Sequence, residues 1–528
     1  LATGTIALWS AFACATPERE PEPVAAPRAV VTPARDLHFV VLHTNDVHGQ
    51  VLTRKGTWID KQNPPQVGGL ARVAAYVNAV REETRASGAE LVVVDAGDWY
   101  QGTPEGLVEG GLGFVRALAL VGYDAMCIGN HEFDHGIPNL LKLLREGGVP
   151  AVCANLHPKG SGERVEWVPA QRIVERGGVR IALVGLLTPI TPEITHADAL
   201  TLDFVEPATA LARVEREVAG RADWILPVTH LGVDGDRALA RAFPKLPLIV
   251  GGHSHTLLRE GKREGETLIV QAGTKASVVG RVDLVVHVPA SDDPQRALAF
   301  RDVRAQLVDL ATEPEARLRS AELDACCAKL AEHTAAKMNE VVGHLSGPAG
   351  RSKDPLVSGA VGNLLADVAR ERAHADVGLM NRGGIRIDLE AGPITRRAIF
   401  EIMPFDNTLV TVSLKGAQLA EVVRRAVEGT AHSGLEVSGL RVRVDVDTTG
   451  KRTLAGLLVQ GTPLDPERVY RVALNSFMAD GGDAYLDAGM ILERKESGAL
   501  LREILEDAFA EKAELSAPAE NRYEAHTP

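Results

Sequence analysis

The sequence has little cysteine, few aromatic residues and no cluster of basic charge, and these shortages exclude several classes of protein. Five cysteines in 528 residues do not form the spaced pairs of a zinc ribbon or a disulfide framework. The formal net charge is −13 and no block of Lys and Arg stands out, so we expect no binding surface for a nucleic acid polymer. After the first residues, no apolar run reaches the roughly 18 residues that span a membrane.

Residues 1–15 are apolar and uncharged, which predicts the hydrophobic part and cleavage site of a signal peptide. Two cleavage sites are compatible with the sequence. Residues 11–14 resemble a bacterial lipobox that would attach a lipid to Cys14, whereas residues 13–15 are typical of ordinary cleavage between small residues. The Pro- and Ala-rich stretch 16–36 predicts an extended tether and favours the lipid anchor. We therefore expect an exported protein of the periplasm or cell envelope, with Cys14 as its only possible membrane attachment.

Five short apolar runs end in residues that commonly bind metal. Runs of this length bounded by Gly are typical of strands buried on both faces. In α/β sheets, ligands bind at the carboxyl ends of such strands. One His after a strand is usually structural, but five such endings favour a shared metal site. The segments that follow the five runs are 45–48, 95–98, 129–134, 229–230 and 251–255.

These segments also carry a family resemblance. Asp46-x-His48, Gly97-Asp98, Gly129-Asn130-His131-Glu132, His230 and Gly251-Gly252-His253-Ser254-His255 resemble the blocks of calcineurin-like metallophosphoesterases. The extension Glu132-Phe133-Asp134-His135-Gly136 is similar to that of the 5′-nucleotidase and UDP-sugar hydrolase branch. The resemblance runs from about Leu37 to about Leu486.

The resemblance implies a site for two divalent metal ions. Its ligands would be Asp46, His48 and His255 at one ion and Asn130, His230 and His253 at the other, with Asp98 bridging both. Two such ions can hold the attacking and leaving oxygens of a displacement at phosphorus. Mixed imidazole, carboxylate and amide ligands favour Zn, Mn or Co over Ca.

His131 and Asp134 have the spacing of a catalytic pair. His131 would reach the phosphoryl or leaving oxygen, and Asp134 would orient its ring. In the alternative interpretation, Asp134 only caps the helix that begins near Ile137. We expect structural roles for Glu132, and for Asp95 as a support of the Asp98 loop.

The pattern of strands and helices predicts two α/β domains. Residues 37–312 alternate apolar runs with helical patterns at 70–81 and 112–121. The resemblance implies that this part is a metallophosphoesterase domain with a calcineurin-like αββα sandwich fold. Segment 313–345 has helical spacing and is predicted to be a linker helix, with a hinge near Val342 and Gly343.

Residues 346–518 show a second α/β pattern, which the resemblance identifies as a C-terminal nucleotide-binding domain. Residues 519–528 are polar and are expected to be a disordered tail. The predicted helices of the second domain are 359–372 and 416–428, and its predicted strands lie near 377–380, 408–414, 440–446 and 470–474.

Three loops of the second domain resemble the substrate-binding loops of the same family. The resemblance implies that Phe405 and Phe477 hold a nucleobase between them, that Asp483 binds ribose hydroxyls and that Arg386 contacts phosphate. Asn381 opens the block Asn381-Arg382-Gly383-Gly384-Ile385-Arg386 and is expected to bind substrate as well. The sequence departs from the family at one place that bears on phosphate binding. Before residues 362–364 the family usually has an acidic residue with an Arg nearby, whereas this chain has 357–360 (VSGA), and its Arg351 lies further upstream.

The sequence therefore predicts an exported, metal-dependent 5′-nucleotidase, with nucleoside diphosphates or UDP-sugars as further substrates. A 2′,3′-cyclic-nucleotide 2′-phosphodiesterase with 3′-nucleotidase activity is the main alternative, because it shares the architecture. A sulfur-oxidation hydrolase of the same superfamily is a more distant one. A non-catalytic surface protein that binds nucleotides is the alternative of another class, and the complete ligand set from Asp46 to His255 argues against it.

Overall fold

The computed structural model describes residues 32–56, 59–60, 62–290, 293, 297–512 and 514–526. The predicted signal peptide, Cys14 and residues 16–31 of the predicted tether lie outside these ranges. Among the residues that are described, no helix is long and apolar enough to cross a membrane. Within the same ranges, the free cysteines are Cys127, Cys153, Cys326 and Cys327.

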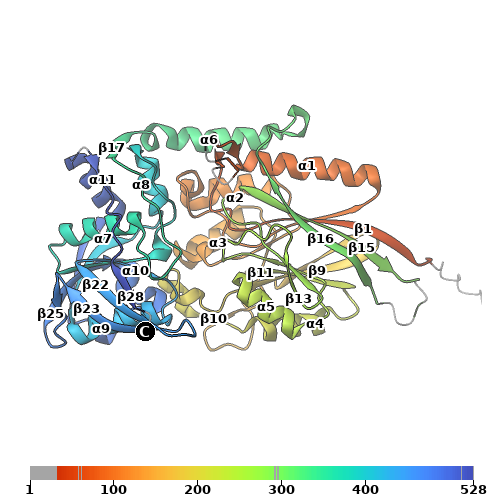
Figure 1. Cartoon of the computed structure of the whole chain (residues 1–528). Coiled ribbons are helices and arrows are strands. Elements are labelled where there is room, and N and C mark those ends of the chain that lie inside the picture. The colour runs from red at the N-terminus through yellow and green to blue at the C-terminus, as the bar shows by residue number, and fades with distance from the viewer. Residues whose placement is uncertain are drawn as a thin grey trace, which may run out of the picture.

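Two six-stranded sheets form the N-terminal domain, which is coloured red to light green in Figure 1. The first sheet has the order β16 (Ala299–Asp309), β15 (Val278–Val288), β1 (Arg35–Thr44), β4 (Glu90–Asp95), β5 (Ala125–Cys127) and β6 (Ala151–Val152). The second has the order β13 (Lys262–Glu264), β14 (Thr267–Val270), β12 (Leu248–Gly251), β11 (Trp224–His230), β9 (Val179–Leu187) and β8 (Gln171–Arg176).

The two sheets pack face to face through side chains such as Phe39, Val94 and Leu226, which belong to one buried cluster. Helices cover the outer faces. The first sheet carries α1 (Leu70–Ser87), α2 (Leu112–Ala119) and α3 (Gly136–Glu146), and the second carries α4 (Pro207–Val218) and α5 (Gly232–Ala242). This arrangement confirms the predicted αββα sandwich. The strands that carry the candidate site lie in the interior of both sheets, where their short apolar runs are buried on both faces.

Helix α6 (Ala321–Met338) joins the domains and runs along the top of Figure 1. Ser320 caps its first turn by accepting a hydrogen bond from the Leu323 amide. Its buried side chains pack on α1 and α2, and its other end contacts α8 (Arg396–Ile402). The predicted linker helix exists but is shorter than 313–345.

The last residues of that predicted helix instead form β17 (Val341–Leu345), which belongs to the C-terminal domain. β17 pairs with β19 (Gly392–Thr395) and β27 (Glu514–Leu515). Gly343 packs so closely that a Cβ there would lie 2.8 Å from the Cβ of Phe509. This packing argues against the hinge expected at Val342 and Gly343.

The C-terminal domain is built on a five-stranded sheet with helices against it. The order is β21 (Leu435–Ser438), β18 (Val377–Asn381), β25 (Val469–Asn475), β20 (Thr408–Lys415) and β26 (Glu493–Leu500). The helices are α7 (Ala360–Arg372), α9 (Gly416–Glu428), the short α10 (Ser476–Ala479) and α11 (Leu501–Lys512). A second sheet has the order β24 (Thr462–Pro463), β23 (Arg452–Val459), β22 (Leu440–Val446) and β28 (Tyr523–His526).

The expectation of a disordered tail is wrong for residues 519–526. β28 pairs in parallel with β22, and the side chain of Tyr523 is buried and donates a hydrogen bond to the Leu435 carbonyl at 2.6 Å. Arg522 is also buried and binds both carboxylate oxygens of Asp367, at 2.8 and 2.7 Å. The polar residues that suggested disorder belong to an edge strand and its flank, which Arg522 and Tyr523 anchor through their buried side chains.

Candidate active site

The structure brings together all seven predicted metal ligands. β1, β4 and β5 are parallel neighbours in one sheet, as are β11 and β12 in the other. The loops that leave their carboxyl ends meet at one edge of the sandwich. Those loops, with the end of β11, supply Asp46, His48, Asp98, Asn130, His230, His253 and His255.

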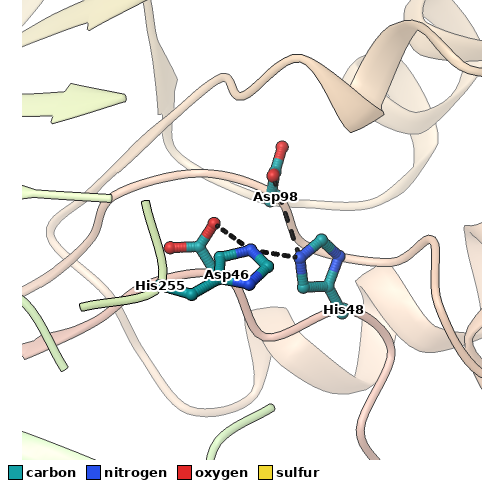
Figure 2. A group of neighbouring side chains, drawn as sticks. All are labelled: Asp46, His48, Asp98 and His255. Atoms are coloured by element: carbon teal, nitrogen blue, oxygen red, sulfur yellow. Dashed lines mark hydrogen bonds and ion pairs between the residues drawn. The ribbon is translucent and has the colours of Figure 1, made fainter. Parts of the chain in front are cut away.

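The first group consists of Asp46, His48, Asp98 and His255, whose ligand atoms all lie within 4.8 Å of one another (Figure 2). The Nε2 atoms of His48 and His255 are 3.1 Å apart. His255 Nε2 lies 3.2 Å from Asp46 Oδ1, and His48 Nε2 lies 3.9 Å from Asp98 Oδ2. Two carboxylates and two imidazoles directed at one point could hold a divalent cation.

The second group shares Asp98 with the first. His230 Nε2 lies 3.1 Å from Asp98 Oδ2 and 3.1 Å from Asn130 Oδ1. His253 Nδ1 lies 3.0 Å from the same Asn130 oxygen. Asp98 Oδ2 therefore faces both groups, as a carboxylate shared by two cations would.

Backbone carbonyls set the tautomers of two of these imidazoles. His48 Nδ1 is 2.8 Å from the Gln101 carbonyl oxygen, and His230 Nδ1 is 2.7 Å from the Ala96 carbonyl oxygen. A carbonyl oxygen only accepts, so each Nδ1 carries a proton and each Nε2 faces the cluster. This donor geometry fits a metal site.

The electrostatics of the cluster centre on Asp98. Burial alone would raise its pKa, but His230 and His131 outweigh burial and hold the pKa of Asp98 well below its ordinary value. Burial alone would lower the pKa of His230, yet Asp98 raises it to about 10. Burial lowers the pKa of His253 to about 3. The shared carboxylate thus stays ionised and attracts positive charge.

Five of the ligand residues have left-handed backbone conformations, which non-glycine residues rarely adopt. This conformation costs about 1–3 kcal/mol per residue and persists only where the surroundings enforce it. It aims successive side chains of a loop at one point, and no sequence pattern reveals it. The φ angles are 50° at Asp46, 48° at His48, 61° at Asp98, 79° at His253 and 52° at His255.

His131 and Asp134 form the predicted pair. His131 Nδ1 donates to Asp134 Oδ2 at 2.6 Å, which directs Nε2 toward Asp98, 3.9 Å away. Burial alone would lower the pKa of His131, but Asp134 and Asp98 raise it. The capping alternative for Asp134 is wrong, because α3 begins at Gly136 and Asp198 accepts the hydrogen bond of its Ile137 amide.

Glu132 and Asp95 are structural, as expected. Glu132 accepts hydrogen bonds from the amides of Asp98, Trp99 and Gly129, at 3.0, 2.7 and 2.7 Å. Asp95 accepts from the Thr44 hydroxyl at 2.6 Å and from the Gly97 amide at 2.9 Å. Both carboxylates therefore fix the loops that carry Asp98 and Asn130.

A cleft of about 720 Å³ lies between the two domains and includes His131, Asp98 and His255 in its wall. Its volume is in the range of small-molecule binding sites. All five residues predicted to bind substrate line it: Asn381, Arg386, Phe405, Phe477 and Asp483. Residues of segment 190–200 of the N-terminal domain, among them Thr195, also line it.

Two contacts across the cleft connect residues predicted to bind substrate to the candidate metal site and to His131. Arg386 Nη2 lies 3.2 Å from His48 Nε2. The ring of Phe405 stacks on that of His131, with centroids 5.6 Å apart and planes at 24°. Asn381 donates to Asp483 at 2.8 Å, so these two residues form one polar unit.

Arg351 is the upstream Arg that stands away from the position at which the family has one for phosphate, and it is not in the wall of the cleft. It donates to the Arg386 carbonyl at 2.8 Å and pairs with Asp388. Arg351 therefore supports the backbone of Arg386 from outside the cleft.

Sequence reasoning missed several residues that join the domains at this site. Gln101 donates to the Pro404 carbonyl at 2.8 Å, Glu193 pairs with His432, and Glu105 forms a two-point ion pair with Arg397 at 2.6 and 2.7 Å. A further contact that was missed lies within the N-terminal domain, where Thr195 donates to Asp134 at 2.8 Å. Each contact joins segments far apart in the sequence, so no local pattern could have shown it.

Comparison with known proteins agrees with both halves of this site. Residues 39–257 match the calcineurin-like phosphoesterase family, and residues 341–488 match the 5′-nucleotidase C-terminal domain. The chain therefore combines a calcineurin-like phosphoesterase domain with a 5′-nucleotidase C-terminal domain. It is a hydrolytic enzyme, and the calcineurin-like phosphoesterase family implies divalent metal ions.

Several known proteins are similar to most of the chain. Protein UshA of Yersinia enterocolitica is 29% identical over 91% of this chain and 92% of its own length. The 5′-nucleotidase of Vibrio cholerae is 27% identical over 85% of each chain. The solved structure of a 5′-nucleotidase precursor from Thermus thermophilus superposes with a TM-score of 0.79 at 28% identity, covering 93% of this chain and 99% of that one.

Proposed function

We propose that the protein is an exported two-metal 5′-nucleotidase that removes the 5′-phosphate of nucleotides, with nucleoside diphosphates and UDP-sugars as further substrates. One observation carries this proposal. A single cleft extends from the Asp and His cluster to Phe405, Phe477 and Asp483 in the other domain. A nucleotide has the matching order of groups: phosphate, then ribose, then base.

Asp46, His48 and His255 would hold one divalent cation, and Asn130, His230 and His253 the other, with Asp98 shared. The donor set fits Zn, Mn or Co, because it combines imidazole nitrogens with carboxylate and amide oxygens. A pair of such cations supplies Lewis-acid activation of water and of the phosphoryl oxygens. The protein fixes the spacing of the ligands through Asp98 and the left-handed loops.

Within this scheme, His131 and Asp134 are the catalytic pair. His131 carries a proton on Nδ1 that Asp134 holds, and its raised pKa favours a second proton on Nε2. From Nε2 it would donate to a phosphoryl oxygen or to the leaving oxygen of the ester. Arg386, beside His48, would bind the phosphate oxygens.

Phe405 and Phe477 would hold the nucleobase, Asp483 would bind the ribose hydroxyls, and Asn381 would orient Asp483. Aromatic faces bind any base with little preference, so this geometry supports a broad range of nucleotides. Phe405 also covers one face of His131, which limits the access of water to the pair.

Export rests on residues 1–15, and lipid attachment rests on Cys14. Mass spectrometry of the mature N-terminus in a bacterial host, for the wild type and Cys14→Ala, separates the two cleavage sites. A lipid-modified Cys14 that is lost in the variant supports the anchor, whereas an unmodified N-terminus after residue 13 or 15 supports ordinary cleavage.

The proposed activity is tested by steady-state rates on 5′-AMP, 3′-AMP, 2′,3′-cyclic AMP and UDP-glucose with added Mn or Co. We expect the highest kcat/KM for 5′-AMP. Preference for 2′,3′-cyclic AMP and 3′-AMP would show the alternative specificity. Binding of 5′-AMP without turnover of any of the four would contradict the proposal altogether.

A further inference from the structure

We infer that Thr195 is a positioning residue for His131 and acts through Asp134; the inference rests on the phosphoester hydrolysis proposed for this site. The hydroxyl of Thr195 donates to Asp134 Oδ1 at 2.8 Å. The other oxygen, Oδ2, accepts the Nδ1 proton of His131 at 2.6 Å. One carboxylate is thus held on both sides, by the hydroxyl and by the imidazole.

The second anchor removes a freedom that the pair alone would have. A carboxylate bound at one oxygen can rotate about its Cβ–Cγ bond, and the imidazole would follow that rotation. With Oδ1 held by Thr195, the carboxylate plane is fixed, and so is the direction of His131 Nε2 toward the cleft. Outer hydrogen bonds of this kind typically contribute roughly 10–100-fold to activity.

The hydroxyl also suits the charge that the pair requires. The hydroxyl donates to one oxygen of Asp134 and the imidazole Nδ1 donates to the other, so both contacts use the carboxylate as an acceptor. Thr195 therefore supports both the orientation and the tautomer of the ring.

The path of the surrounding segment is held by other contacts. Thr191 donates to the Thr188 carbonyl at 2.7 Å, Asp198 accepts from the Ile137 amide at 3.2 Å, and Glu193 pairs with His432 of the C-terminal domain. These contacts anchor the segment on both sides of Thr195. The hydroxyl is therefore better explained by what it does to Asp134.

The test is a double-mutant cycle on the metal-loaded, full-length enzyme. Thr195→Val removes the hydroxyl at nearly constant shape, and Thr195→Ser retains it. We expect Thr195→Val to lower kcat on 5′-AMP about tenfold with little change in KM, and Thr195→Ser to stay near wild type. In the Asp134→Asn background, Thr195→Val should have almost no further effect, because both changes act on the same interaction.

Thr201→Val is the matched control. Its hydroxyl donates to the Asp198 carbonyl at the surface, and the residue is not in the wall of the cleft. This variant should keep wild-type activity. Metal content and thermal unfolding of every variant are measured in parallel, so that a loss of folding or of metal is recognised.

Three results would overturn the inference. The first is a double variant whose fold-loss in kcat equals the product of the losses in Thr195→Val and Asp134→Asn alone. The second is an effect on KM alone, which would make Thr195 an ordinary contact of the cleft wall. The third is a loss in Thr195→Ser equal to that in Thr195→Val. If the wild type hydrolyses p-nitrophenyl phosphate but not 5′-AMP, the proposed nucleotidase activity is wrong. The inference about Thr195 is then tested by measuring kcat of the same variants on p-nitrophenyl phosphate.

Discussion

The N-terminal half of the cleft is made mostly of buried groups in enforced conformations, whereas the C-terminal half combines half-buried side chains on loops with the buried pair Asn381 and Asp483. Asp46, Asp98 and His230 are at most 1% exposed. Arg386, Phe405 and Phe477 keep part of their surface accessible to solvent. Both halves line the same cleft, but left-handed backbone holds five candidate ligands of the N-terminal half. Among the predicted substrate-binding residues of the C-terminal half, Asp483 shares this conformation and accepts a hydrogen bond from Asn381.

This difference suggests a division of labour. Chemistry at phosphorus requires charges placed within a fraction of an ångström, which buried and doubly bonded residues provide. Recognition of a base requires apolar area and tolerates more freedom. Changes in the N-terminal half should therefore abolish turnover of every substrate, and changes in the C-terminal half should alter which substrate is used.

The largest effect is expected at the shared carboxylate. Asp98→Asn should reduce activity by more than the roughly 10²–10⁴-fold expected for loss of a general acid, because it weakens both cation sites together. The loss is measured as kcat on p-nitrophenyl phosphate, with metal content determined by mass spectrometry. Treating the wild type with a chelator should cause a similar loss of activity, which added Mn or Co should reverse. Asp234→Asn, an exposed substitution of the same type on α5, is the control. Near-normal activity in Asp98→Asn would remove the basis of the two-metal site.

His131→Ala should come next, with a loss in kcat of roughly 10²–10⁴-fold at unchanged metal content. Asp134→Asn should reproduce part of this loss, because the ring loses its partner. His333→Ala, the same substitution at an exposed position on α6, is the control and should keep wild-type activity. A His131→Ala protein without metal would show that His131 is a ligand or a structural residue.

A smaller effect is expected at Arg351, on the C-terminal side. Arg351→Ala removes one hydrogen bond to the Arg386 carbonyl, for which about 0.5–1.5 kcal/mol is typical. The loss should appear in KM for 5′-AMP, by roughly two- to tenfold, with kcat retained. A loss as large as that of Arg386→Ala would mean that Arg351 itself binds substrate.

Substitution of His43 in β1 is expected to have the smallest effect on activity. It should instead change how the free energy of unfolding depends on pH. Burial lowers the pKa of His43 to about 3, from an ordinary value of 6.5. Between these values the unfolded chain binds a proton that the folded chain does not. The free energy of unfolding should therefore fall as pH decreases through this window, by up to about 1.4 kcal/mol per pH unit.

His43→Leu should reduce that slope, because the titrating group is gone, while activity at neutral pH is retained. Urea unfolding between pH 4 and pH 7 measures it. His38→Leu, an exposed position on the same strand, should leave the slope unchanged. Identical slopes for the wild type and His43→Leu would show that His43 is protonated in the folded state.

Much of the fold could be predicted, because its signals are local. β22 and α9 begin and end where the apolar patterns place them, at Leu440–Val446 and Gly416–Glu428. A metal site was also predictable, since five buried apolar runs end in ligand-type residues and parallel strands bring their carboxyl ends to one edge; the seven individual ligands were predicted through the family resemblance. The αββα sandwich itself was predictable only through the family resemblance.

The features that could not be predicted depend on distant partners. Tyr523 and Arg522 look like residues of a polar tail until β22 and Asp367 are placed beside them. β17 continues a helical pattern in sequence, and only its pairing with β19 makes it a strand. Thr195 lies 61 residues from Asp134 in a segment without a motif.

The most direct test of the division of labour is the effect of Phe477→Ala on two substrates. Phe477 is the better choice of the two aromatic residues, because Phe405 also stacks on His131 and its loss would disturb the catalytic pair. We predict that Phe477→Ala lowers kcat/KM for 5′-AMP by an amount equivalent to roughly 1–3 kcal/mol, the usual effect of a lost base-stacking contact. For p-nitrophenyl phosphate, which has no base, kcat/KM should stay within about twofold of wild type. Equal losses on both substrates would contradict the account and show that Phe477 supports the fold and does not bind the base.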